Sequence, residues 1–396
     1  MKKADSVQSV KDAKNCCGCG ICSAVCPRQV ISMEITARTG KTEPVIGDAC
    51  VDCGVCLQLC PQAETLAAPE GRTGTEGEGL QKPLQSLTLR STKKGLLQNA
   101  TSGAFVTTLV QYLLEKECYT TAFLVKEHAY ADVVQTSACR EVTRLERTQK
   151  SRYIQVAHTD EVRYLIAHPE EQVIVVGTPC YLKGLEKVLK RFRLNRENYL
   201  LIGLFCDKTM TANVWDYFQT VFAQGKLSEM DFRNKKAGGW PGDVCLYLED
   251  GTEMVLPRKE RMDVKEYFMP ECCLGCMDKL NPFADISVGD DYIHGKDQLG
   301  ANTVLVRTER GEQIWEQCKE LFEWENVAFE QVLKSQHMDG RQKTMQNNLP
   351  QLKKKLALGQ SRAYDEIQKE LSEKRRKAKN PVRRVLRKLG QIIRSF

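Results

Sequence analysis

The chain has 396 residues, 42% of them hydrophobic, which predicts two or three folded domains rather than one small core or a disordered chain. Its net charge is +7, and it contains 18 cysteines. Residues 1–14 lack the apolar core of a signal peptide, and no apolar stretch approaches the roughly 20 residues that span a bilayer. We therefore expect a cytoplasmic chain whose clustered thiols stay reduced and serve as metal ligands or reactive groups.

Two runs of cysteines near the N-terminus share the spacing C-x2-C-x2-C-x3-C-P. They begin at Cys16 and Cys50 and end at Pro27 and Pro61. In two-cluster ferredoxins the fourth cysteine of such a run ligates the other cluster. One 4Fe-4S cluster is therefore assigned to Cys16, Cys19, Cys22 and Cys60. The other is assigned to Cys50, Cys53, Cys56 and Cys26.

Zinc is the alternative interpretation of these runs. A zinc site needs only four thiolates, and it explains neither an exchanged fourth cysteine nor the proline that follows that cysteine in the sequence. Short strands are expected at residues 30–35 and 44–46, between the runs, so the segment resembles a bacterial two-cluster ferredoxin. Cys17 does not fit the spacing and is interpreted as a non-ligand.

After the second run the composition shifts to Gly, Glu, Thr and Lys, which predicts a linker. From Ser102, which is expected to cap a helix, helical and strand patterns alternate and predict a larger mixed α/β core. The fold class is therefore α+β, with a small ferredoxin-like domain joined to that core and a helical basic tail. The expected divisions are the ferredoxin domain at 1–66, a linker at 67–95, the two parts of the core at 96–225 and 226–345, and the tail at 346–396.

Four further cysteines lie at turns of the expected core. Cys180 and Cys206 each follow a strand, and Cys273 and Cys276 form a C-x2-C pair. Four thiols at turns are enough for a third cluster. Cysteines at strand ends also occur as ordinary packing residues or as reactive thiols, and the spacing alone leaves these three interpretations open.

Six short blocks give the core a family resemblance. They are TSG at 101–103, SRYIQ at 151–155, VGTPC at 176–180, GLFC at 203–206, CLGC at 273–276 and ADISVGD at 284–290. In this order they resemble the coenzyme F420 hydrogenase/dehydrogenase beta-subunit family over about residues 95–310. Two positions depart from the family pattern: Ala104 replaces a glycine, and Asp207-Lys208 replaces His-Gly.

The resemblance implies a bound FAD and a third 4Fe-4S cluster. The expected cluster ligands are Cys180, Cys206, Cys273 and Cys276, with Cys272 as an alternative to Cys273. The residues assigned to the flavin are Ser102, Gly103, Ser151, Tyr153, Gln155, Thr178 and Pro179. Purely structural roles are the alternative, such as a helix cap for Ser102 and a core position for Tyr153. No catalytic residue is assigned.

The implied function is that of an iron–sulfur flavoprotein oxidoreductase. Clusters pass single electrons, whereas organic substrates usually exchange hydride, so a flavin is needed between them. The partner would be a redox protein or a small hydride donor or acceptor, with coenzyme F420 as one candidate. The alternative is a non-catalytic ferredoxin-type electron-transfer subunit for a partner enzyme, for example in surface polysaccharide synthesis.

The C-terminal segment differs in charge from the rest of the chain. Residues 374–396 contain ten Lys or Arg and no acidic residue, and apolar residues recur every three or four positions after Pro381. This pattern predicts a basic amphipathic helix, which suits an anionic membrane surface on the cytoplasmic side. Docking onto a protein is the second interpretation. Nucleic-acid binding is not expected, because no recognition motif accompanies the charge.

Overall fold

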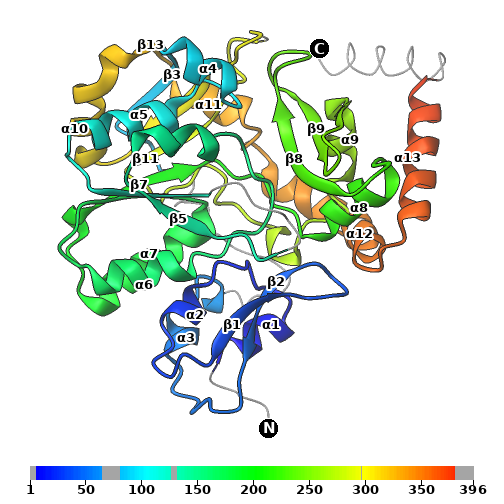
Figure 1. Cartoon of the computed structure of the whole chain (residues 1–396), viewed down its shortest axis with the longest axis horizontal. Helices are drawn as coiled ribbons and strands as arrows, with labels where there is room; N and C mark the ends of the chain where they lie inside the picture. The colour runs from blue at the N-terminus through cyan, green and yellow to red at the C-terminus, as the bar shows by residue number, and fades with distance from the viewer. Residues whose placement is uncertain (1–5, 65–80, 126–131, 296, 380–396) are drawn as a thin grey trace.

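The structure is a computed structural model that describes residues 6–64, 81–125, 132–295 and 297–379. Figure 1 shows a small N-terminal module below a large sheet with helices, and a smaller sheet beside the large one. No helix in the described ranges is long and apolar enough to cross a membrane. The chain is thus a mixed α/β protein with a ferredoxin-like N-terminal region and a larger sheet core, as expected.

The N-terminal module alternates cysteine loops, short helices and one hairpin. Strands β1 and β2 pair antiparallel, with Ile31 opposite Ile46. Gly20 and Gly54 adopt the left-handed conformation directly before the two helices that carry cysteines, which glycine does without steric cost. The elements are α1 (Gln8–Asp12), α2 (Ile21–Ala24), β1 (Ile31–Ile35), β2 (Thr42–Ile46) and α3 (Val55–Gln58).

The core is built on an eight-stranded sheet with the strand order β13-β3-β12-β11-β7-β6-β4-β5. The four strands β11, β7, β6 and β4 are parallel to their neighbours within this group, and the remaining pairings are antiparallel. Their bounds are β3 (Gln85–Ser91), β4 (Thr121–Val125), β5 (Thr136–Cys139), β6 (Val173–Gly177), β7 (Tyr199–Leu204), β11 (Ile286–Asp290), β12 (Asn302–Val306) and β13 (Phe322–Asn326).

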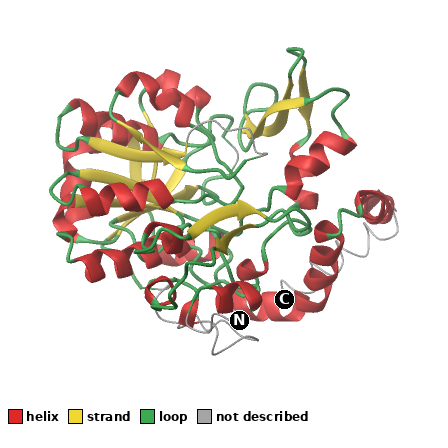
Figure 2. Cartoon of the chain, turned by 60° about the horizontal axis from the view of Figure 1, so that its bottom comes forward, coloured by secondary structure: helices red, strands yellow, loops and turns green. Residues whose placement is uncertain are grey.

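Helices cover both faces of this sheet (Figure 2), because residues alternate between two apolar clusters along its central strands. In β7, Leu200 and Ile202 pack toward α5 (Phe105–Glu115) and α10 (Glu309–Cys318). Tyr199 and Leu201 pack on the other face. The helices on that face are α6 (Thr159–Ala167) and α7 (Pro179–Phe192). A short helix, α4 (Lys94–Asn99), precedes α5 in the chain.

The second, smaller sheet has the antiparallel order β10-β9-β8 and its own apolar core. Ile367 and Leu371 of the C-terminal helix are fully buried in that core. The elements of this part are α8 (Asn213–Val221), β8 (Leu227–Asn234), β9 (Asp243–Leu248), β10 (Glu253–Leu256), α9 (Arg258–Val264), α12 (Arg341–Gln360) and α13 (Tyr364–Lys379). The helix α11 (Phe329–Ser335) packs instead against the large sheet, in a cluster with Leu305 of β12.

Two expectations are corrected by the fold. The linker expected at 67–95 is wrong in its second half, because β3 is an inner strand of the large sheet, with Leu87 and Leu89 buried. Ser102 does not cap the following helix: its hydroxyl donates to the Ala301 carbonyl, 2.5 Å away, and Ala104 is the N-cap residue, in the left-handed conformation. Polarity misled both predictions, since Thr88 of β3 donates to the Asp291 carboxylate inside the core and Ser102 donates to a backbone carbonyl.

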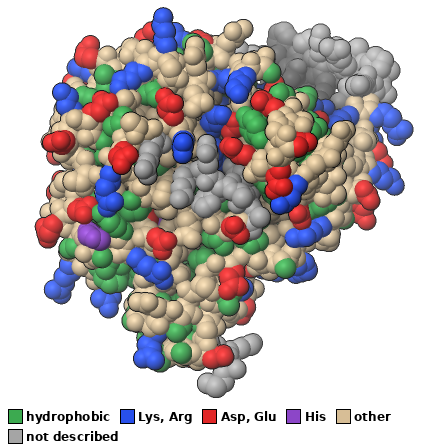
Figure 3. All heavy atoms as spheres, viewed as in Figure 1, with side chains coloured by type: hydrophobic (Ala, Val, Ile, Leu, Met, Phe, Trp, Pro, Cys, Tyr) green, Lys and Arg blue, Asp and Glu red, His purple; other side chains and the backbone are tan. Residues whose placement is uncertain are grey.

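The basic C-terminal helix predicted beyond residue 379 lies outside the described residues, and so does the stretch at 65–80. On the face of the molecule seen in Figure 3, acidic and basic side chains are interspersed.

Candidate iron–sulfur centres and cofactor site

The structure brings together the four cysteines assigned to the first cluster, including the one from the other run. Burial raises the pKa of the Cys16 thiol to about 12, and the nearby charge of Cys60 adds to this. The pKa of Cys22 is raised by burial and by the charges of Cys16 and Cys60. Cys60 accepts a hydrogen bond from the backbone amide of Gln62, 3.4 Å away. Cys60 of the second run therefore lies near the first three cysteines of the first run, as the expected exchange requires.

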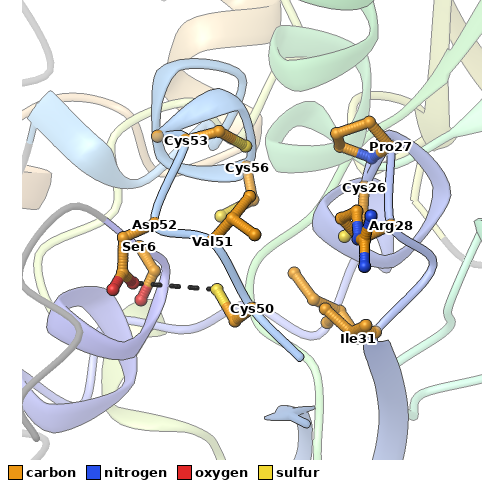
Figure 4. A pocket seen from close by; sticks show the side chains of 12 residues that line it. Ser6, Cys26, Pro27, Arg28, Ile31, Cys50, Val51, Asp52, Cys53 and Cys56 are labelled. Carbon is orange, nitrogen blue, oxygen red and sulfur yellow. Dashed lines mark hydrogen bonds between the residues drawn. The ribbon is translucent and has the colours of Figure 1, made fainter. Parts of the chain in front are cut away.

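The second set of cysteines lines an open pocket on the module. Figure 4 shows Cys26 entering this pocket from the first run, while Cys50, Cys53 and Cys56 come from the second. Burial raises the pKa of Cys56, and Cys26 and Cys50 lie close enough for their charges to raise it further. The Cys50 thiol donates to Asp52 Oδ1 at 3.7 Å.

The third set converges at one edge of the large sheet. Cys180 lies in the first turn of α7, which directly follows β6, and Cys206 follows the end of β7. The carboxyl ends of these two neighbouring parallel strands therefore place both thiols at the same end of the sheet. Burial raises the pKa of Cys206 well above its ordinary value, followed by the charges of Cys273, Cys180 and Cys276. Cys272 is buried, 4% exposed, whereas the charge of Cys273 acts on both Cys206 and Cys180. The geometry thus favours Cys273 over Cys272.

The chemistry of all three donor sets fits iron–sulfur clusters. Thiolate is the form that binds metal, and buried thiolates are costly unless positive charge compensates them. In each set the thiol pKa values are raised, because without a metal the buried thiolate form is unfavourable. The positive charge of the iron in a cluster would offset this cost. In the described ranges no group of three or more His, Cys, Asp or Glu side chains is arranged to hold a single metal ion.

Most residues assigned to the flavin make structural contacts. A Cβ on Gly103 would lie 2.7 Å from the Asn302 amide nitrogen and the Leu89 carbonyl, so this glycine serves close packing. The Ser151 amide donates to Thr101 Oγ1 at 2.9 Å. Thr178 is the N-cap residue of α7, its hydroxyl lies 3.4 Å from the Cys180 sulfur, and Pro179 is the first residue of that helix.

Tyr153 contacts buried arginines, and Gln155 contacts the N-terminal module. The Tyr153 hydroxyl accepts from Arg233 at 3.1 Å, and the Arg261 guanidinium lies over the Tyr153 ring, 4.8 Å from its centroid. Gln155 accepts from the Thr42 amide of the module at 3.0 Å, while its buried Nε2 has no hydrogen-bond partner among the described residues. This segment therefore joins the ferredoxin-like module to a group of buried cations.

The most charged part of this site lies outside the residues assigned to the flavin. From the sequence alone, Arg233, Lys235 and Trp240 are candidates to meet an anionic substrate, with a solvated charged loop as the favoured interpretation. Arg233 is buried and paired with Asp290 at 2.6 Å, at the carboxyl end of β11. Within the described part of the chain, the buried Nε atoms of Arg152 and Arg261 lack hydrogen-bond partners, as does Nε1 of Trp240. Burial lowers the pKa of Arg261, and burial followed by the charge of Arg233 lowers that of Lys235 to about 8. Unsatisfied buried donors of positive charge fit an anionic ligand.

Nothing in the periodicity of the sequence marked these cations. Arg152 lies inside the block at 151–155, between residues that were assigned to the flavin, and that is the one signal that pointed to it. Arg261 is contributed by α9, far along the chain, and only the fold brings it to Tyr153.

The fold and the cysteine sets define an iron–sulfur protein of the electron-transfer type, with a ferredoxin-like module on an α/β core. Residues 15–63 match the model of the 4Fe-4S dicluster domain. Residues 170–330 match the family model that describes the C-terminal part of the beta subunit of coenzyme F420 hydrogenase/dehydrogenase. The resemblance expected from the six blocks is thereby confirmed.

Two curated relatives and one solved structure extend this result. The chain is 27% identical over 233 residues to the coenzyme F420-dependent sulfite reductase of Methanocaldococcus jannaschii, covering 54% of this chain and 34% of that protein. It is 25% identical over 251 residues to the coenzyme F420 hydrogenase subunit beta of Methanosarcina barkeri, covering 60% of this chain and 79% of that protein. The chain thus spans about a third of the length of the sulfite reductase it matches.

A chain of the F420-reducing [NiFe] hydrogenase complex from Methanosarcina barkeri has a similar fold. The TM-score is 0.50 at 20% identity, and the match covers 67% of this chain and 92% of that chain. This similarity shows the shared fold alone.

Proposed function

We propose that this chain is an iron–sulfur flavoprotein oxidoreductase. Single electrons would pass through three 4Fe-4S clusters to or from an FAD, which exchanges hydride with an organic substrate. The observation that carries the proposal is the convergence of three cysteine sets in one chain, beside buried cations whose donors lack partners. Ligands of α/β sheets bind beyond the carboxyl ends of parallel strands, where Cys180, Cys206 and Asp290 lie.

The residues around Tyr153 are suited to hold a phosphate-bearing cofactor. Arg152 and Arg261 would bind its phosphate oxygens, because their buried N–H groups lack acceptors. Arg233 is held in place by Asp290 and orients the Tyr153 hydroxyl. A flavin bound here would supply the conversion between one-electron and hydride chemistry. The residues of the chain would bind and orient the flavin and exclude water from it.

Anaerobic reconstitution followed by iron, sulfide and flavin analysis tests this proposal. We expect about twelve irons, since each cluster contains four, together with one flavin per chain. A preparation with about eight irons and no flavin would contradict the enzyme function and leave the module as the only electron carrier.

The second candidate function is an electron-transfer subunit that serves a separate catalytic protein. It is favoured by the relative from Methanosarcina barkeri, which is named as a hydrogenase beta subunit. Reduction of added coenzyme F420, or of another hydride acceptor, by the isolated chain would decide for the enzyme. Activity that appears only with a copurifying partner would decide for the electron-transfer role.

The cytoplasmic location remains part of the proposal, because clustered cysteines that stay reduced suit a reducing compartment. Attachment to an anionic membrane through the basic segment beyond residue 379 is a further proposal. Cosedimentation with anionic lipid vesicles, compared with a chain truncated after Lys379, tests it.

A further inference from the structure

The first residue of α12, Arg341, joins the two turns that carry Cys206 and Cys276. Its Nη1 donates to Asp207 Oδ1 at 2.9 Å, and its Nη2 donates to the Asp207 carbonyl at 3.2 Å. Its Nε donates to the Cys276 carbonyl at 3.3 Å. Asp207 directly follows Cys206 in the chain. Because the donors of a guanidinium lie in one rigid plane, this single side chain fixes the backbone beside two of the four ligands assigned to the third cluster.

The position of Arg341 is itself fixed by the start of α12. Its side chain is buried, 8% exposed. Gly340, the N-cap residue of α12, adopts the left-handed conformation, and the Arg341 amide donates to the Met338 carbonyl at 3.2 Å. Met338 is buried in a cluster with Leu280 and Leu305 of the core. The guanidinium is therefore anchored from behind, and it points at the two ligand turns.

The rest of α12 supports the same part of the site. Leu352 and Leu356 form an apolar cluster against which Cys273 packs, and Gln360 Nε2 donates to Glu271 Oε1 at 2.7 Å, just before the Cys-x2-Cys turn. The match to the family model ends at residue 330, so α12 lies beyond the matched segment. This helix thus contacts the Cys-x2-Cys turn at both of its ends.

The contact also brings charges close to the third cysteine set. Asp207 is 38% exposed and is surrounded by cations: Arg341 at 2.9 Å, Lys265 at 3.3 Å and Lys208 at 3.8 Å. A cluster held by four thiolates carries negative charge, and its reduction adds more. A cation nearby therefore favours the reduced form, and an anion nearby favours the oxidised form.

We propose that Arg341 is a positioning residue of the third cluster, which holds the turns of Cys206 and Cys276 together and, balanced against Asp207, sets the reduction potential. This inference rests on the proposed function, because it requires the third cluster. It assigns to α12 a role in the redox centre, although α12 contributes no ligand to the assigned set.

Redox titrations followed by EPR test the charge part of the inference. In Arg341→Gln the third cluster should be harder to reduce by about tenfold in its reduction equilibrium, which is about 59 mV for one electron. Arg341→Lys keeps the charge and should restore most of the potential. Asp207→Asn should shift the potential the opposite way, because it removes a negative charge. A purely structural contact would not give shifts of opposite sign for its two partners.

Chelation of iron tests the positioning part. In Arg341→Gln about four of the twelve irons should pass to a ferrous chelator faster than in the wild type. The matched control is Arg310→Gln, at the start of α10, which removes an arginine paired with Glu197 at 3.3 Å and should leave both measurements unchanged. The Cys206→Ser variant, which should lack the third cluster, identifies its EPR signal.

The outcomes separate this inference from the proposed function. Unchanged potentials in Arg341→Gln and Asp207→Asn, in chains that hold about twelve irons, would overturn the inference and leave the proposed function intact. Shifts of the same sign in both variants would also overturn it. A wild-type chain with only about eight irons would overturn both.

Discussion

The ferredoxin-like module and the core hold their cysteines in opposite ways. In the module the first three ligands of each set lie three residues apart on tight loops, so a run of eleven residues, such as 16–26, supplies three ligands of one set and the fourth ligand of the other. In the core the ligands come from the ends of β6 and β7 and from a turn some 70 residues further on. The first arrangement is local, so the spacing of the cysteines in the sequence predicts it. The second exists only once the large sheet has formed.

This difference predicts how each centre depends on folding. The module has a small apolar cluster that includes four of its own cysteines, so the clusters themselves would supply much of its stability. The core has two extensive apolar clusters without module residues and should stay folded when its iron–sulfur cluster is missing.

Removal of Cys60 is expected to have the largest effect. Cys60→Ala should abolish the first cluster, about four irons, although this cysteine belongs to the second run. It should also unfold part of the module, because metal binding and folding are coupled. Iron analysis and circular dichroism measure both effects.

The matched control is Cys245→Ala, which removes a buried cysteine of the smaller sheet. Retention of twelve irons by Cys60→Ala would mean that the exchanged ligand set is wrong.

Loss of a core ligand should be milder. Cys206→Ser is expected to lose about four irons while the module keeps about eight. The thermal unfolding of the core should change little, since its apolar clusters remain intact. Cys318→Ser, at a buried cysteine of α10, is the control. Equal loss of module and core irons in Cys206→Ser would show that the two regions are not independent.

The buried cations should affect ligand affinity rather than fold. Arg261→Gln should weaken flavin binding roughly tenfold, since a hydrogen bond to a charged group contributes about 1.5–3 kcal/mol. The flavin-free chain should not lose stability, because an unsatisfied buried cation has been removed. Fluorescence titration with FAD and thermal unfolding measure the two effects, with Lys226→Gln at the exposed surface as control. Unchanged affinity would place the flavin elsewhere.

The smallest effect concerns pH. The pKa of Lys235 is lowered to about 8, so this amine is charged below that pH and neutral above it. Affinity for an anionic ligand should therefore fall as the pH rises from 7 to 9, by up to about fivefold for a partly exposed ion pair. In Lys235→Met the affinity should be low throughout and this pH dependence should vanish. A pH profile that is identical in wild type and variant would assign the titration to another group.

The sequence predicted well whatever depends on neighbouring residues. The two short strands expected between the cysteine runs are present as β1 and β2, and Cys60 lies near Cys16, as the spacing indicates. The strand β3 was missed, because its polar residues Gln85, Ser86 and Thr88 suggested a linker, yet they lie in an inner strand of the large sheet.

The candidate site shows the same limit. Tyr153 was named from a short block, but its partners Arg233 and Arg261 are about 80 and 110 residues away and no local pattern connects them.

Native mass spectrometry of the anaerobically purified chain tests the central claim most directly. We predict a mass excess over the apoprotein equal to three Fe4S4 clusters and one FAD, and the loss of one Fe4S4 unit in the Cys206→Ser variant. An excess equal to two clusters, or to bound zinc, in the wild-type chain would contradict it.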